Sequence, residues 1–161
     1  MRYAAVIAAA LALCCCGRPI APADREEARR AGLELQSVMD MASSKQIPPV
    51  EFETGSSRLL ESSYPLLDRV AEVLLRYSHL KLIVAGHTDD TGSDARNERL
   101  SLERAGAVKM YLAKKGVYPD SVRVYGYGSS QPLINDRTDK ARAMNRRVEF
   151  RITTRDWAAV Y

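Results

Sequence analysis

Residues 80–93 read Leu-Lys-Leu-Ile-Val-Ala-Gly-His-Thr-Asp-Asp-Thr-Gly-Ser, and this stretch decides the fold. Residues 80–85 are apolar apart from Lys81, which is typical of a central strand covered on both faces. Residues 86–93 are polar and contain two glycines, which predicts a loop. Asp89 therefore lies just beyond the carboxyl end of a central strand, where open α/β sheets place their binding sites.

The segments on either side of this strand predict two long helices. Residues 66–75 carry apolar side chains with helical period on one face, after a serine cap at Ser62 or Ser63. After the loop, Asp94 can cap a second helix that runs to about Lys115, where Gly116 follows. The apolar positions expected of this second helix are Leu102, Ala105, Val108 and Leu112.

Three further stretches predict strands. Apolar and polar residues alternate over 50–54 and 148–152, and Val122 and Val124 mark a third strand. A short helix is predicted over 138–145. The order strand, helix, strand, helix, strand, short helix, strand predicts an α/β sandwich with a mixed four-stranded sheet. Right-handed crossovers would place the helices on one face of that sheet.

Four blocks of this sequence resemble the OmpA-like C-terminal domains, a family that includes peptidoglycan-associated lipoproteins and the periplasmic domains of flagellar motor stators. The blocks are Val50-Glu51-Phe52-Glu53-Thr54-Gly55-Ser56, residues 84–93, Asn97-Glu98-Arg99-Leu100-Ser101-Leu102-Glu103-Arg104-Ala105, and Asn145-Arg146-Arg147-Val148-Glu149. The family more often has Asp at the position of Glu53. The resemblance runs from about Pro49 to Thr153 and implies the family's βαβαβ(α)β fold.

The resemblance also implies a ligand, which is the peptide stem of peptidoglycan and chiefly its diaminopimelate. That residue presents an ammonium and a carboxylate on one short carbon chain. Its site therefore needs one anion and one planar cation about a ligand's length apart. By family match, Asp89 takes the ammonium and Arg104 takes the carboxylate. Arginine suits the second role because its fork makes two parallel bonds to a carboxylate.

Four other positions match the family's binding site. Asn97 and the first backbone amides of its helix can add donors for an anion. By family match, Arg146 closes the other side of the site, and Thr91 and Leu100 line it. The predicted peptidoglycan-binding set is therefore Asp89, Arg104, Asn97, Arg146, Thr91 and Leu100.

The charged members of this set also have plainer interpretations. Asp89 could cap its own loop through a backbone hydrogen bond, and Arg104 could form an ion pair on the surface of its own helix. Arg146 and Arg147 are adjacent, so in a strand they point to opposite faces and at most one belongs to the site. Arg147 alternates with Glu149, and we expect it to be solvated.

Histidine and cysteine usage argues against an enzyme or a metal centre. We expect His87 to orient its loop by hydrogen bonding, because the other histidine, His79, lies at the start of the same strand and a zinc site needs at least three protein ligands. The three cysteines are confined to positions 14–16, and no Gly-x-Ser-x-Gly elbow is present. The sequence predicts a binding protein with no catalytic residue, no cofactor and no metal.

The charge balance and the hydropathy limit the classes of partner that this protein can bind. The net charge is +4 and the charges are interspersed, which suits an acidic polymer but argues against nucleic acid. A motor stator would need a transmembrane helix with an ionisable residue, and no stretch after the first 16 residues has that character. The alternative that the family leaves open is a partner-binding subunit of an envelope complex, as in a Tol-Pal assembly.

The N-terminus has the pattern of a secretory signal. Arg2 precedes an apolar run over 3–13, which is too short to span a bilayer, and three cysteines and Gly17 follow. This end resembles a bacterial lipobox, although the residue before the cysteine is not the usual Gly, Ala or Ser. Cys16 is the predicted site of acylation, with Cys15 the second choice and an ordinary cleaved signal the alternative.

These observations divide the chain into four parts. Residues 1–16 are predicted to be a lipoprotein signal ending at the acylated cysteine, and 17–48 a spacer that is partly helical and outside the core. Residues 49–155 form the binding domain and 156–161 a tail. In lipoprotein families, an Asp directly after the acylated cysteine favours the inner membrane. Residue 17 is Gly, so the outer membrane is the expected location. We expect a lipoprotein anchored there, facing the periplasm and tethering the membrane to peptidoglycan.

Overall fold

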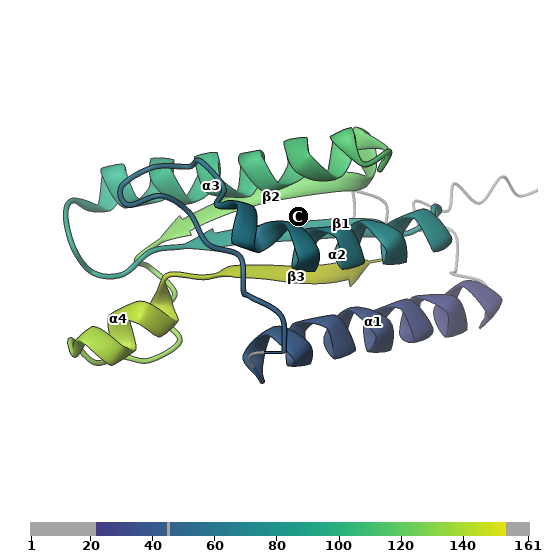
Figure 1. Ribbon diagram of the computed structural model, residues 1–161, viewed down its shortest axis with the longest axis horizontal. Coiled ribbons are helices and arrows are strands. Elements are labelled where there is room, and N and C mark those ends of the chain that lie inside the picture. The colour runs from purple at the N-terminus through teal and green to yellow at the C-terminus, as the bar shows by residue number, and fades with distance from the viewer. Residues whose placement is uncertain (1–21, 45, 154–161) are drawn as a thin grey trace, which may run out of the picture.

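The computed structural model describes residues 22–44 and 46–153, and its centre is a mixed sheet with strand order β2-β1-β3 (Figure 1). β1 spans Lys81–His87, β2 spans Val122–Gly128 and β3 spans Val148–Thr153. β1 pairs in parallel with β2 and antiparallel with β3. Residues 81–85 of the predicted stretch 80–85 therefore lie in the central strand, which also includes Gly86 and His87 from the predicted loop, and every residue from Leu82 to His87 is buried.

Two long helices pack on this sheet at the predicted places. α2 spans Tyr64–Arg76, with Pro65 in its first turn, and α3 spans Asp94–Lys114. Their apolar stripes meet Leu82 and Val84 in one core. Gly116 has a φ of +97°, a left-handed conformation that glycine adopts at little cost, and it stands just beyond the end of α3.

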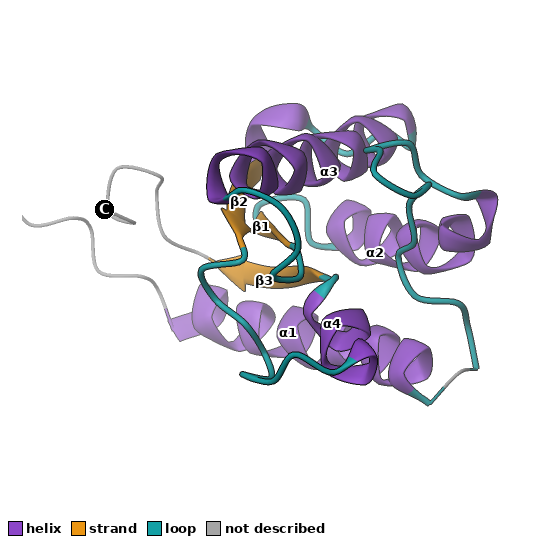
Figure 2. Ribbon diagram, turned by 90° about the vertical axis from the view of Figure 1, so that its left-hand side faces the viewer, coloured by secondary structure: helices purple, strands orange, loops and turns teal. Residues whose placement is uncertain are grey.

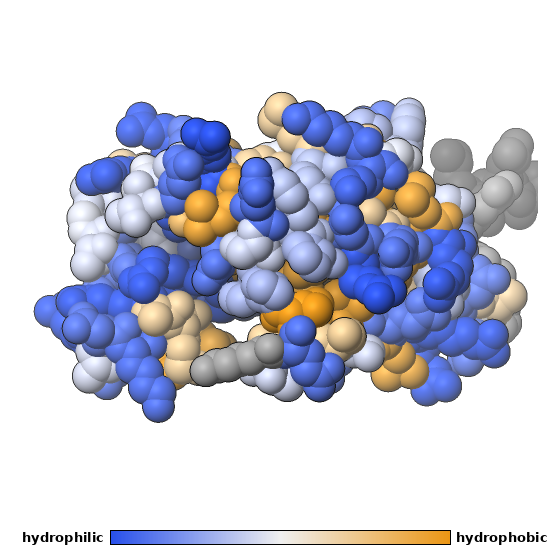
Figure 3. Space-filling view, viewed as in Figure 1, coloured by the Kyte–Doolittle hydropathy of each residue, from blue (hydrophilic) through white to orange (hydrophobic). Residues whose placement is uncertain are grey.

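A third long helix corrects the prediction for the spacer. α1 spans Pro22–Ser43, runs through Gly32 without a break, and contacts α2 and β3. Leu35 and Val38 belong to the main core, so the expectation that this segment lies outside the core is wrong. Figure 3 shows hydrophobic side chains along the line where α1 meets the rest of the molecule. In Figure 2 the three long helices form an arc around one side of the sheet.

The sheet has three strands in the described residues, so the prediction of a fourth over 50–54 is wrong. The alternation in this stretch reflects half-burial of Phe52 rather than pairing in the sheet. Its backbone bonds are made within a short hairpin instead, where Glu53 N donates to Arg58 O and Leu60 N donates to Glu51 O. Phe52 and Leu59 form an isolated bridge in this hairpin, and Gly55 turns it with a φ of +68°.

The backbone of α3 lies directly on the glycines of the sheet. A Cβ atom on Gly86 would stand 2.2 Å from the carbonyl oxygen of Ser101, and one on Gly126 would stand 2.5 Å from Leu102 N. The hydroxyl of Ser101 also accepts a hydrogen bond from Gly128 N over 2.9 Å. Glycine is required here because a larger residue would push the helix away from the strands.

The short predicted helix is also present. α4 spans Asp139–Asn145 and is capped by Thr138, whose hydroxyl accepts a hydrogen bond from Ala141 N. Single 3-10 turns span Glu61–Ser63 and Pro119–Ser121. None of the helices in the described part of the chain combines the length and the apolar composition that a bilayer crossing requires.

Candidate functional site

Asp89 lies in the loop between β1 and α3, at the carboxyl end of the central strand. Its side chain Oδ1 accepts hydrogen bonds from the backbone N of Thr91, over 3.0 Å, and from the Thr91 hydroxyl. Asp89 therefore does cap its own loop, as its plainer interpretation predicts. The residue is 8 % exposed, so its charge is held close to the protein interior.

A second partner reaches Asp89 from α4. Arg146 follows this helix directly, and its Nη1 donates to Asp89 Oδ2 over 2.8 Å. Burial raises the pKa of Asp89, but the hydrogen bonds from Thr91 and Arg146 outweigh burial and hold that pKa below its ordinary value. Asp89 is consequently a carboxylate at neutral pH.

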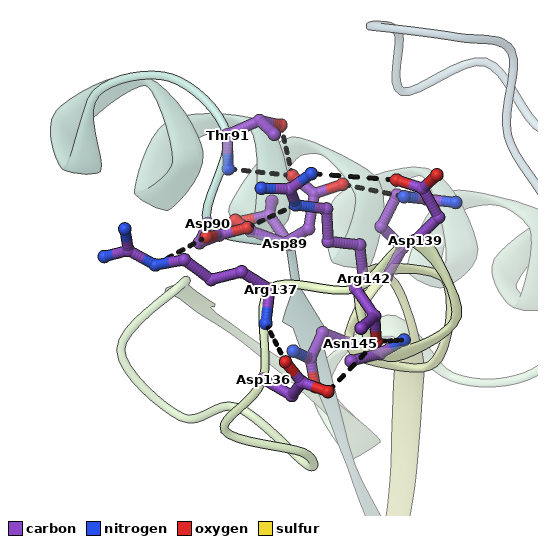
Figure 4. Close-up of polar contacts among 12 residues, drawn as sticks. Asp89, Asp90, Thr91, Asp136, Arg137, Asp139, Arg142 and Asn145 are labelled. Carbon is purple, nitrogen blue, oxygen red and sulfur yellow. Dashed lines mark hydrogen bonds and ion pairs between the residues drawn. The ribbon is translucent and has the colours of Figure 1, made fainter.

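The position of Arg146 depends on a polar contact between α4 and the loop of Asp89 (Figure 4). Asp90, the next residue of that loop, accepts a hydrogen bond from Arg142 Nε over 2.8 Å and lies 3.5 Å from Arg137 Nε. Asn145, at the end of α4, also bonds the backbone of Leu133 and Ile134. Sequence reasoning did not find this contact, because nothing in the spacing of Asp90 and Arg142 signals that they meet.

Arg104 reaches the same region from α3. It is 9 % exposed, its Nε donates to Ser56 O over 3.0 Å, and its guanidinium carbon lies 5.1 Å from the centre of the Phe52 ring. Within residues 22–44 and 46–153, no carboxylate forms an ion pair with Arg104, so the predicted surface pair is not formed. Burial lowers the Arg104 pKa, nearby Arg146 lowers it further, and the charge of Asp89 opposes both effects.

Ser56 and Phe52 are thus site residues that the sequence analysis missed. Both belong to the first block of the family resemblance, but that block was interpreted as a strand and a turn. Because the segment folds into a hairpin, its turn supplies a carbonyl to the guanidinium and its aromatic ring lies against it. The backbone bond fixes Nε and leaves the two Nη groups as the donors for a further partner.

Asn97 acts on the loop itself. Its side chain Nδ2 donates to the carbonyl oxygens of Thr91, over 3.0 Å, and Asp89, over 3.3 Å, and the residue is 4 % exposed. This arrangement makes Asn97 a support for the loop of Asp89. Leu100 is half-buried at the wall of a polar hollow of about 300 Å³ on the surface of α3. The other residues of this hollow are Gly55, Arg96, Arg99 and Glu103.

His87 does not have the predicted role. Among residues 22–44 and 46–153, neither ring nitrogen of His87 has a hydrogen-bond partner. Nε2 lies 3.7 Å from Glu149 Oε1, and the ring stacks on Tyr127 with centroids 5.4 Å apart. Arg147 is half-buried and pairs with Glu149 over 2.6 Å, so the prediction that Arg147 is solvated is also wrong. Burial, together with Arg147, lowers the His87 pKa, and Glu149 opposes them.

The described residues contain no cluster of histidine, cysteine and carboxylate side chains that could hold a metal ion. The site offers the buried carboxylate of Asp89, the buried guanidinium of Arg104 and the more exposed guanidinium of Arg146. These charges are complementary to the ammonium and carboxylate of a small zwitterion.

A comparison with protein families identifies the family of this chain. The model described as the OmpA family matches residues 51–146, which include both Asp89 and Arg104. The chain belongs to the OmpA family. The fold class and the family resemblance predicted from the sequence are therefore confirmed.

Two relatives show the extent of the sequence similarity. Outer membrane porin F of Pseudomonas fluorescens is 41 % identical over 62 % of the chain and 31 % of its own length. The peptidoglycan-binding protein ArfA of Mycobacterium tuberculosis is 35 % identical over 73 % of the chain and 35 % of its own length. The chain thus spans about a third of the length of these relatives.

Two solved structures share this OmpA family fold. The peptidoglycan-associated lipoprotein of Burkholderia pseudomallei superposes with a TM-score of 0.61 at 25 % identity, covering 65 % of the chain and 88 % of that protein. The C-terminal domain of MotB from Helicobacter pylori gives a TM-score of 0.60 at 27 % identity, covering 68 % of the chain and 86 % of that domain.

Proposed function

We propose that this OmpA family domain binds peptidoglycan non-covalently through the diaminopimelate of the peptide stem. The observation that carries the proposal is the state of Arg104. It is a guanidinium that is 9 % exposed and pairs with no carboxylate among the described residues. A buried cation without a counter-ion is costly, so a ligand carboxylate that pairs with it gains more than it would at the surface.

The second half of the ligand fits Asp89. A carboxylate has about four acceptor positions. The protein fills three of them, two on Oδ1 through Thr91 and one on Oδ2 through Arg146. One position on Oδ2 is left for the ammonium of a ligand. Arg146 keeps Asp89 charged and in place before the ligand arrives, which lowers the cost of ordering the site.

The relatives support this assignment. The Mycobacterium tuberculosis relative is named a peptidoglycan-binding protein, and a structural neighbour is a peptidoglycan-associated lipoprotein. Membership of the OmpA family also places the chain among binding proteins rather than enzymes. The site has the groups for holding a zwitterion and needs no cofactor to do so.

The place of the domain in the cell follows from the N-terminal pattern. We infer that Cys16 is acylated and that the protein is a lipoprotein of the outer membrane, facing the periplasm. The cysteines lie outside the described residues, so this inference rests on the lipobox resemblance and on relatives that are outer membrane proteins. Replacing Cys16 with alanine should release the protein from the membrane fraction, whereas replacing Cys15 should not.

A single site of this kind binds weakly. Each charge-assisted hydrogen bond contributes about 1.5–3 kcal/mol, and association itself costs several kcal/mol. We therefore expect a dissociation constant of roughly micromolar or weaker for one stem. Durable attachment comes from holding the domain at a membrane surface that faces a polymer of repeated stems.

The direct test is sedimentation of the protein with insoluble peptidoglycan of the diaminopimelate type. Wild type should sediment, and Asp89→Asn and Arg104→Gln should stay in the supernatant. Asp40→Asn and Arg69→Gln are matched controls, because they make the same changes at exposed groups on α1 and α2, and both should sediment. Circular dichroism checks that every variant is folded. Equal sedimentation of all five proteins would overturn the proposal.

A further inference from the structure

The polar hollow on the surface of α3 holds positive charge that the proposed site does not use. Its volume is about 300 Å³, and it is lined by Gly55, Arg96, Arg99, Leu100 and Glu103. Both arginines are exposed, and within residues 22–44 and 46–153 neither forms an ion pair. Two arginines and one glutamate give the lining of the hollow one excess positive charge.

A hairpin turn places this hollow next to the ligand site. Ser56 O accepts the hydrogen bond from Arg104 Nε, and a Cβ atom built on the preceding residue, Gly55, would stand 4.0 Å from Arg96 Nη2. The same turn therefore lies against both arginines. Leu100 is half-buried between them, because positions 96, 100 and 104 are four residues apart and follow one side of α3.

The spacing of these two arginines matches the spacing of two carboxylates in one peptide stem. Eight residues of α3 separate Arg96 from Arg104, which is about 12 Å along the helix axis. In the stem, diaminopimelate follows a glutamate that is linked through its side chain, so the α-carboxylate of that glutamate is free. The bonds between this group and the side-chain carboxylate of diaminopimelate span up to roughly 14 Å. A stem that pairs with Arg104 can therefore reach the hollow.

We propose that Arg96 and Arg99 form a second anion subsite, which binds the α-carboxylate of the glutamate next to diaminopimelate. The two arginines are three residues apart and so are neighbours on the helix surface, where both can donate to one carboxylate. Glu103 lies about 6 Å farther along the axis than Arg99, so it leaves the Arg96 end of the hollow to an anion.

Because diaminopimelate must first be held by Asp89 and Arg104, this subsite rests on the proposed function. The carboxylate at the end of the stem is the other source of an anion, but it is consumed where the stem is cross-linked. Water and salt screen the exposed Arg96 and Arg99, so each pair contributes less than the buried Arg104 does. We expect the glutamate carboxylate to improve affinity for the stem by about threefold to tenfold.

The test is NMR titration of the full-length protein, in mild detergent, with three synthetic stems of alanine, γ-linked glutamate, diaminopimelate and alanine. One stem is unmodified, the second carries an amide on the glutamate α-carboxyl, and the third carries an amide on the terminal alanine. Wild type should bind the second stem about threefold to tenfold more weakly than the first and the third. Arg96→Gln combined with Arg99→Gln should bind all three alike, at the weaker affinity.

A matched control removes the same charge elsewhere. Arg29→Gln combined with Arg69→Gln alters exposed arginines on α1 and α2 and should keep the preference of wild type. Equal wild-type affinity for the first two stems, or a preference that survives in the Arg96 and Arg99 variant, would overturn the subsite and leave the diaminopimelate site intact. Weaker binding of the third stem alone would overturn the assignment to glutamate. If no stem binds, the proposed function fails and the subsite fails with it.

Discussion

The guanidinium of Arg146 donates to the carboxylate of Asp89 over 2.8 Å and so joins the end of α4 to the loop after β1. Two segments that are 57 residues apart in the sequence meet at this bond. Burial raises the Asp89 pKa, but the hydrogen bonds from Thr91, together with this contact, keep it below its ordinary value.

Replacing Arg146 with glutamine should raise the Asp89 pKa toward the ordinary aspartate value, which carbon-13 NMR of the carboxyl can follow through a pH titration. A group with a lowered pKa in the folded state adds stability above its unfolded pKa and loses it as pH falls through the folded pKa. The variant should therefore lose about 1 kcal/mol or less of unfolding free energy at neutral pH, because Arg146 is 48 % exposed. The loss should disappear in acid. Arg137→Gln, at an 88 % exposed arginine, should change neither quantity.

Arg104 should decide which peptidoglycan is bound. Stems with lysine in place of diaminopimelate keep the ammonium but lack the second carboxylate. Wild type should bind the diaminopimelate wall about tenfold to a hundredfold more tightly, which corresponds to one charge-assisted bond. Arg104→Gln should bind both walls weakly and about equally in the same sedimentation assay, and Arg69→Gln should keep the preference. A preference that survives in Arg104→Gln would assign the carboxylate to another residue.

His87 should make the fold sensitive to acid. Burial and Arg147 lower its pKa below the ordinary value of 6.5, so the unfolded chain binds a proton more readily than the folded one. The free energy of unfolding, measured in urea, should therefore fall as the pH drops below 6.5. His87→Phe keeps a flat ring against Tyr127 and removes the titration. Its stability should be nearly constant over the same interval, and an unchanged slope in that variant would contradict the prediction.

Two glycines should respond in opposite ways to the same substitution. Gly86→Ala places a Cβ atom 2.2 Å from the carbonyl of Ser101, so it should destabilise the domain by about 3 kcal/mol or more in urea unfolding. Gly32→Ala, on α1, has nothing within 4 Å and should stabilise the domain by up to about 1 kcal/mol. Equal effects at the two positions would show that α3 does not rest on the strand as closely as described.

Hydrophobic periodicity was sufficient to predict α2, the central strand and α3, in this order. Those segments bury one continuous stripe, and a stripe is visible in a single sequence. Residues 50–54 were misjudged because alternation reports which side chains are buried, not which backbone groups pair. α1 was underestimated because two of its buried positions, Ala31 and Ala42, are too small to stand out as a pattern.

The candidate site, like the fold, was predicted only in part. Asp89 and Arg104 were predicted because they stand in motifs at fixed spacing along the chain. The carbonyl of Ser56 and the Asp90–Arg142 contact depend on where a hairpin and a short helix come to rest. No local pattern encodes these placements, since each joins residues about 50 positions apart.

The glycines beneath α3 have one more consequence. Asp89 is fixed to the end of β1, and Arg104 is carried by the helix that rests on Gly86 and Gly126 with backbone in contact with backbone. The backbone positions of Asp89 and Arg104 are consequently set by main-chain contacts, and Ser56 O and the Phe52 ring hold the Arg104 guanidinium in place. The domain should measure ligand length, so that a diamino acid one methylene longer or shorter than diaminopimelate satisfies one charge and leaves the other without a partner.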